Sequence, residues 1–216
     1  MLMKQERPVI HKVNLGFNFY KDIIHPQKIE LCGSTNTGTT AFSLYISKKF
    51  HDCNLTTVYI DVSRRLTKQY LLQNNSYDSL VIVPATTTEQ IYDIIEKFKL
   101  SADLFILDDI SGISTGNKYA YEHKRLLKNL INYLNRELIN NSIIYINQVR
   151  INTINGQAYF PYGYLLEKNT SIRLRELEKR QGYRIIQGKF EKNDFGTEDY
   201  FSFKLYQNRL EGDVKC

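Results

Sequence analysis

Tryptophan is absent from the sequence, and its 216 residues include only four prolines and three cysteines. The cysteines, Cys32, Cys53 and Cys216, form no C-x-x-C or other ligand spacing, so neither a zinc site nor a disulfide framework is expected. No apolar run approaches the roughly 20 residues that cross a bilayer, and the polar N-terminus is unlike a signal peptide. We therefore expect a soluble, intracellular (cytoplasmic) protein that does not bind membranes.

The composition is that of a folded chain with a modest excess of positive charge. Hydrophobic residues make up 42% and charged residues 24%, which excludes wholesale disorder. There are 29 Lys and Arg against 23 Asp and Glu, giving a net charge of +6. This excess favours an anionic partner without naming one.

Short apolar runs alternate with stretches of helical periodicity along most of the chain. The runs at 28–32, 57–61, 80–83, 104–107 and 143–146 predict buried strands. Helices are predicted over 39–50, around 91–98 and over 119–140. The segments 171–175, 183–190 and 200–206 alternate with period two, as antiparallel strands do. This order predicts an α/β fold with a mainly parallel sheet flanked by helices and antiparallel strands at its C-terminal edge.

Residues 33–40 have the spacing of the phosphate-binding P-loop, G-x-x-x-x-G-K-[ST], and lie between a predicted strand and a predicted helix. In such a loop, backbone N–H groups and the helix dipole hold phosphates, and the hydroxyl of Thr40 would bind Mg²⁺. Thr39 replaces the lysine, so the anion-binding backbone stays while the charge is lost. The candidate nucleotide-binding residues are Gly33, Ser34, Thr35, Asn36, Thr37, Gly38, Thr39 and Thr40.

A second feature of P-loop proteins follows downstream. The segment LFILDD (104–109) is an apolar strand that ends in acidic residues, as the Walker B strand does, and Asp108 would hold magnesium through water. The alternative is that Asp108 caps the following helix.

Residues 168–192 contain eight Lys or Arg and three Glu, a net charge of +5 that favours either a binding surface or a solvated face.

Taken in order, the segments resemble the RecA family of recombinases over residues 28–210. IELCGSTNTGTTAFSLYISKKF, TVYIDVSRRL, SLVIVPATTTEQIYDIIEKF and ADLFILDDISGI are similar to its P-loop, second, third and Walker B units. The most specific match is INQVR (146–150), which resembles the family's N-Q-[IV]-R, where the glutamine senses the γ-phosphate and leads into a DNA-binding loop. The resemblance implies a RecA-like P-loop core at 28–210, with an N-terminal segment 1–27 and a C-terminal tail 211–216.

Two departures from the family bear on catalysis. Thr39 stands where the family has lysine, and Ser63 stands where it has its catalytic glutamate. A serine hydroxyl is no general base near neutral pH without a base of its own. Asp61 or Asp109 could substitute, although neither follows the pattern, so we expect little or no ATP hydrolysis. If the chain is active, Asp108 and Gln148 are the catalytic candidates; binding of ATP and Mg²⁺ and the absence of any cofactor both remain open.

The segment after Arg150 carries aromatic residues that could stack on single-stranded bases or form a protein interface. The basic residues of the late strands could contact phosphates. The DNA-binding candidates are Arg150, Tyr159, Tyr162, Tyr164, Lys168, Arg173, Arg175, Lys189 and Lys192, with Phe160 as a further aromatic in the loop.

Three functions are compatible with this sequence. The first is a DNA recombination or repair protein that binds single-stranded DNA as a non-hydrolysing filament or accessory subunit, through self-association or a RecA-like partner protein. The second is a catalytically silent structural subunit of a protein complex. The third is a DNA-dependent ATPase with displaced catalytic residues.

Overall fold

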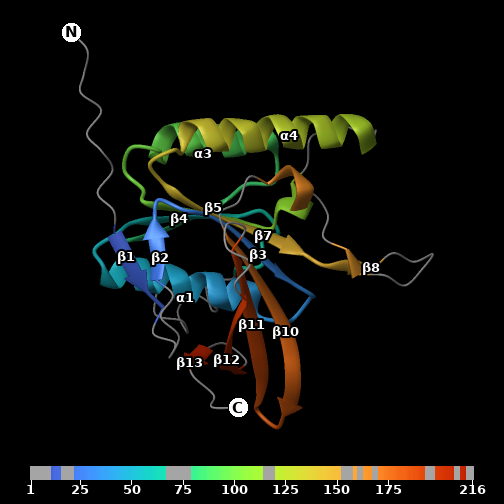
Figure 1. The fold of residues 1–216 in the computed structure, drawn as a ribbon. Coiled ribbons are helices and arrows are strands. Elements are labelled where there is room, and N and C mark those ends of the chain that lie inside the picture. The colour runs from blue at the N-terminus through green and yellow to red at the C-terminus, as the bar shows by residue number, and fades with distance from the viewer. Residues whose placement is uncertain are drawn as a thin grey trace.

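A mixed sheet of nine strands forms the centre of the part of the chain that the structure describes (Figure 1). The structure is a computed structural model. It describes residues 11–15, 22–66, 79–113, 120–151, 158–159, 163–166, 170–192, 198–206 and 210–212.

The sheet has a parallel part and an antiparallel part. Its order is β13-β12-β11-β10-β3-β7-β6-β4-β5. Neighbouring strands from β10 through β3 to β5 are parallel, and those from β10 to β13 are antiparallel. The predicted α/β class, with antiparallel strands following a parallel sheet, is therefore confirmed. The bounds are β3 (Lys28–Gly33), β4 (Thr57–Asp61), β5 (Leu80–Pro84), β6 (Leu104–Asp108), β7 (Ser142–Gln148), β10 (Thr170–Arg180), β11 (Tyr183–Lys192), β12 (Glu198–Tyr206) and β13 (Leu210–Gly212).

Helices cover both faces of the parallel part (Figure 1). Helix α1 (Thr39–Asp52) lies on one face, and α3 (Thr88–Phe98) and α4 (Ala120–Glu137) lie on the other. Every residue of β4 and β6 is buried, because these strands are covered on both sides. The predicted helix at 119–140 is observed over 120–137, and Tyr119 lies outside the described residues.

The apolar core on the α1 face contains residues from early and late parts of the described chain. Phe42 of α1 stacks on Phe201 and Phe203 of β12, with ring centroids 5.4 Å apart in each pair. Val13 and Ile23, from the hairpin of β1 (His11–Asn14) and β2 (Asp22–His25), belong to the same apolar cluster. Part of the predicted N-terminal segment 1–27 thus packs against the core.

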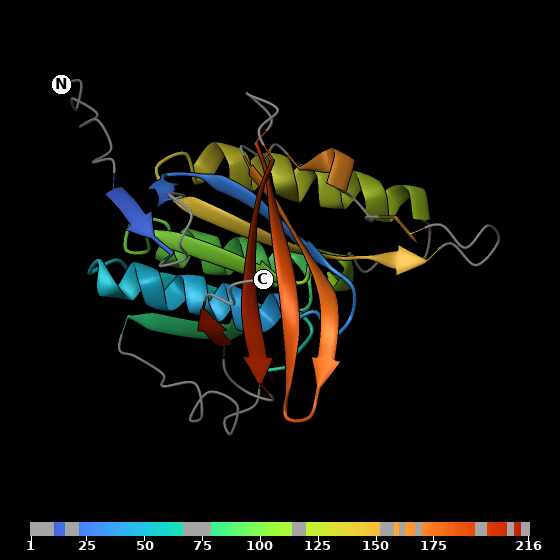
Figure 2. The ribbon, with the colours of Figure 1, turned by 60° about the horizontal axis from the view of Figure 1, so that its bottom comes forward.

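The antiparallel strands form an extension longer than the sequence pattern indicated. Strand β10 continues through residues 176–180, four of which are charged, and β10 and β11 run together past the edge of the sheet (Figure 2). The register of the β10–β11 pairing shifts between Glu176 and Glu178, which marks a β-bulge. Two short strands, β8 (Arg150–Ile151) and β9 (Ala158–Tyr159), pair beside the parallel sheet. Two single-turn helices, η1 (Ile110–Gly112) and η2 (Gly163–Leu165), complete the described elements.

Candidate functional site

The loop between β3 and α1 is a tight turn held by a glycine at each end. A Cβ atom at Gly33 would lie 2.2 Å from the Oγ1 of Thr37, so only glycine fits there. The N–H and hydroxyl of Thr37 both donate to the carbonyl oxygen of Ser34, at 3.1 and 2.8 Å. Gly38 has a φ of +83°, in the left-handed region that favours glycine. Gly33 is thus required by the space beside Thr37, and Gly38 by its backbone conformation.

The start of α1 is free of side-chain capping. Gly38 is the N-cap and makes no side-chain hydrogen bond, and no acidic residue lies in the first helical turn. The N–H groups at such an end lack partners within the helix and carry partial positive charge, which favours an anion. Thr39, in the lysine position of the motif, is buried. The backbone is therefore arranged for an anion, while residue 39 supplies no charge.

Asp108, the last residue of β6, contacts the loop directly. The Thr40 hydroxyl donates to Asp108 Oδ2 at 2.7 Å, and the buried Tyr59 hydroxyl donates to the same oxygen at 2.6 Å. These partners come from α1 and β4, not from the helix that follows Asp108, so the capping alternative is wrong. Residues 33–40 and Asp108 thus meet at one edge of the sheet.

The environment of Asp108 suits a hard divalent cation. The side chain is fully buried, and Oδ1 has no hydrogen-bond partner among the residues that the structure describes. Burial raises the pKa of Asp108, and the hydrogen bonds from Tyr59 and Thr40 partly offset this. Carboxylate and hydroxyl oxygens are the ligands that Mg²⁺ takes in phosphate sites. Thr40 and Asp108 therefore fit the ion.

Gln148 lies beside the loop, as the resemblance implies. It ends β7, pairs with Gly33 in the parallel register, and is followed by Val149, whose N–H donates to the Gly33 carbonyl at 2.9 Å. The side-chain oxygen of Gln148 is 3.5 Å from the guanidinium of Arg65. The loop, Asp108 and Gln148 thus gather at the carboxyl edge of β3, β6 and β7.

The possible substitutes for the missing base are engaged in other contacts. Both carboxylate oxygens of Asp61 accept backbone N–H groups, from Arg65 at 3.1 Å and Leu66 at 3.0 Å, and so fix the turn after β4. Asp109 accepts a hydrogen bond from the Ser111 hydroxyl. Among these described residues, no carboxylate holds the place of the family's glutamate.

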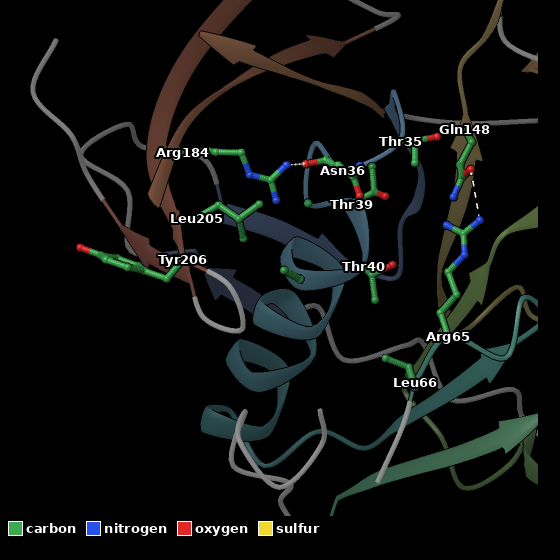
Figure 3. A pocket seen from close by; sticks show the side chains of 12 residues that line it. Thr35, Asn36, Thr39, Thr40, Arg65, Leu66, Gln148, Arg184, Leu205 and Tyr206 are labelled. Atoms are coloured by element: carbon green, nitrogen blue, oxygen red, sulfur yellow. Dashed lines mark hydrogen bonds between the residues drawn. The ribbon is translucent and has the colours of Figure 1, made fainter. Parts of the chain in front are cut away.

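A pocket with a volume of about 210 Å³ opens in front of α1. Arg184 points to Asn36 of the loop, and Arg65, on the opposite side of this pocket, points to Gln148 (Figure 3). Neither arginine was predicted as a site residue: Arg65 lies in the segment TVYIDVSRRL but at no motif position, and Arg184 comes from a distant part of the chain. The lining residues are Thr35, Asn36, Gly38, Thr39, Thr40, Ala41, Arg65, Leu66, Gln148, Arg184, Leu205 and Tyr206.

The predicted DNA-binding residues divide among three places. Arg150 and Tyr159 are register partners in the β8–β9 hairpin, and both are exposed. Tyr164 lies in η2, where the Lys124 ammonium is 4.8 Å from its ring centroid. Residues 160, 162 and 168 lie outside the described residues, as does the side chain of Lys192.

The third place is a groove of about 330 Å³ on β10, β11 and β12, lined in part by Arg173, Arg175, Lys189 and Tyr200. These residues alternate with buried ones that face α1, so the groove lies on the opposite face of the strands. Glu191 pairs with Arg173 at 3.0 Å and with Lys189 at 3.1 Å, which neutralises part of the predicted charge.

No family model matches the sequence, and no curated protein matches it. Among the described helices, none has the length and apolar character required to cross a membrane. In the same described ranges, no three His, Cys, Asp or Glu side chains gather as a metal-binding cluster.

Proposed function

We propose that the chain is a RecA-like core that binds a nucleoside triphosphate at residues 33–40 and binds single-stranded DNA without rapid ATP turnover. The observation that carries this proposal is the place of Gln148. This residue lies beside the loop at Gly33, and Arg150 follows two residues later on the hairpin with the exposed Tyr159. One short segment therefore runs from the phosphate loop to a surface with a cation and an aromatic ring.

The site favours binding over hydrolysis. The uncapped start of α1 offers N–H groups to phosphates, and Thr40 and Asp108 would hold Mg²⁺, which neutralises phosphate charge when bound. Ser63, in the glutamate position, only approaches the Asp108 carbonyl, with 3.5 Å between the oxygens. Because none of the residues that the structure describes is placed to activate water, we expect phosphate release to be slow with or without DNA.

Two surfaces support DNA binding. The hairpin presents Arg150 and Tyr159, and the groove presents Arg175, whose hydrogen-bond partner, Gln187, is neutral and 2.8 Å away. Cations contact phosphates and aromatic rings stack on bases, which is the pattern of single-strand binding without base specificity. Tyr200, with Lys189 5.9 Å from its ring centroid, adds an exposed ring to the groove.

The test is binding of a fluorescent oligothymidine by anisotropy over a series of salt concentrations, with and without Mg²⁺ and ATP. Wild-type protein should bind at low salt, and Arg175→Ala should weaken binding and reduce the salt slope by about 0.7, the value for one lost phosphate contact on a single strand. Arg180→Ala is the matched control, since Arg180 is an exposed arginine at the far end of the same strand, paired with Glu178.

Two results would contradict the DNA assignment. One is a wild type that ignores the oligonucleotide at low salt, which favours the structural-subunit alternative. The other is an equal loss in both arginine variants, which indicates nonspecific attraction to net charge. DNA-stimulated phosphate release that Asp108→Asn abolishes would instead favour the ATPase alternative.

A further inference from the structure

Two arginines lie where a triphosphate would need positive charge. A lysine at the seventh position of a P-loop reaches the terminal phosphates, and this chain has the buried Thr39 there. Arg65 follows β4, and Arg184 lies on β11, so 119 residues of sequence separate them. Both nevertheless line the pocket that opens in front of α1 (Figure 3).

Arg184 reaches the loop from the antiparallel extension. Its guanidinium donates to the backbone carbonyl of Asn36, inside the loop itself. The strand is held close on this side, because a Cβ atom at Gly38 would lie 2.6 Å from Leu205, the β12 residue that pairs with Arg184. Glu176 is the carboxylate near Arg184, at 3.6 Å. This distance is longer than the roughly 2.7–2.9 Å of a strong charge-assisted hydrogen bond, so the guanidinium has donors left for an anion.

Arg65 approaches from the other side. Its backbone is fixed by the Asp61 carboxylate, while its side chain is about half exposed and extends to Gln148. Asp109 lies 3.9 Å from the Arg65 guanidinium. This ion pair is also longer than a direct hydrogen bond, so Asp109 orients the arginine and leaves donors available to a ligand.

We propose that Arg65 and Arg184 together supply the charge that Thr39 lacks, and that the polyphosphate of a nucleoside triphosphate binds between them, over the start of α1. This proposal rests on the proposed nucleotide site and names the residues that give it affinity. Guanidinium groups suit this task because their planar fork binds phosphate oxygens in pairs. A nucleoside monophosphate, with a single phosphate, cannot contact the helix start and both arginines at once.

The proposal is tested by calorimetry with Mg²⁺ and AMP-PNP, a non-hydrolysable ATP analogue, and with AMP as the short probe. Arg65→Ala and Arg184→Ala should each weaken AMP-PNP binding by about tenfold or more, the effect of a lost hydrogen bond to a charged group. Lysine at either position should restore part of the loss. AMP should bind weakly to all variants, with differences below about threefold.

Arg180→Ala is the matched control, because Arg180 lies on the same extension, pairs with Glu178 and lines neither the pocket nor the groove. Its AMP-PNP affinity should equal that of the wild type, and thermal melts should show that every variant folds. A wild type that does not bind AMP-PNP refutes the nucleotide site as a whole. A wild type that binds, with both alanine variants within twofold of it, refutes the arginine pair and leaves the nucleotide site standing.

Discussion

Replacing Asp108 by asparagine should make the protein more stable at neutral pH without magnesium and nucleotide. Asp108 is fully buried, and both of its hydrogen bonds go to Oδ2, while Oδ1 has no partner among the described residues. An amide oxygen can accept the same two bonds from Thr40 and Tyr59, and a neutral amide costs less to bury than a carboxylate. The amide nitrogen would take the place of Oδ1 and would also lack a partner, so the gain comes only from burying a neutral group instead of a charge, and we expect about 1 kcal/mol.

The pH dependence of this gain has a definite sign. Burial raises the pKa of Asp108 in the folded protein above its value in the unfolded chain. Between these two values the folded state binds more protons, so wild-type stability falls as the pH rises through this window. The variant lacks the titrating group. Its advantage should therefore be largest above the pKa of Asp108 in the folded protein and should shrink as the pH is lowered toward the ordinary pKa of an aspartate.

Thermal melts of both proteins at several pH values measure the effect, with a shift of about 2–4 °C for each kcal/mol in a chain of this size. Asp61→Asn is the matched control with the opposite sign. Both oxygens of Asp61 accept backbone N–H groups, so the amide nitrogen would replace one acceptor and lower stability. An Asp108→Asn protein that melts below the wild type at pH 8, or by a margin independent of pH, would refute this account of the site.

Two further predictions concern packing and reactivity. Gly188→Ala should lower the free energy of unfolding in urea by about 1–3 kcal/mol, because its Cβ would lie 1.9 Å from the Phe201 ring. Gly112→Ala, whose Cβ would have its nearest atom at 3.4 Å, should be nearly neutral, and equal effects of the two variants would contradict this. Burial raises the pKa of Cys32 to about 12, so in a Cys53→Ser, Cys216→Ser background the native protein should not react with a thiol reagent at pH 8 until it unfolds. Rapid labelling of the native state would show that Cys32 is accessible.

The parallel half of the sheet could be predicted because each strand is a short apolar run with a polar or glycine end. Once β3, β6 and β7 are parallel neighbours, Gly33, Asp108 and Gln148 must lie at one edge. The three motifs meet for that topological reason. Parallel pairing alone predicts that they lie together, without any information about side-chain packing.

The arginines and the extension could not be predicted in the same way. Four of the five residues 176–180 are charged and Leu177 is exposed, so no alternation of buried and exposed positions marks β10 beyond Arg175. Its length is set by pairing with β11, a contact between segments. Arg184 has no local signal that it reaches Asn36, which lies 148 residues earlier in the sequence. Long-range pairing of this kind is specified by the whole sheet.

The stacking of Phe42 on Phe201 and Phe203 has a consequence for the order in which the chain is made. The helix that begins within residues 33–40 packs against β12, a strand synthesised more than 140 residues later. Because domains fold as units as the chain emerges, one apolar face of α1 stays uncovered until β12 has been synthesised. A nascent chain that ends before Leu205 lacks one wall of the pocket. The pocket beside residues 33–40 is thus completed only after β12 has been synthesised.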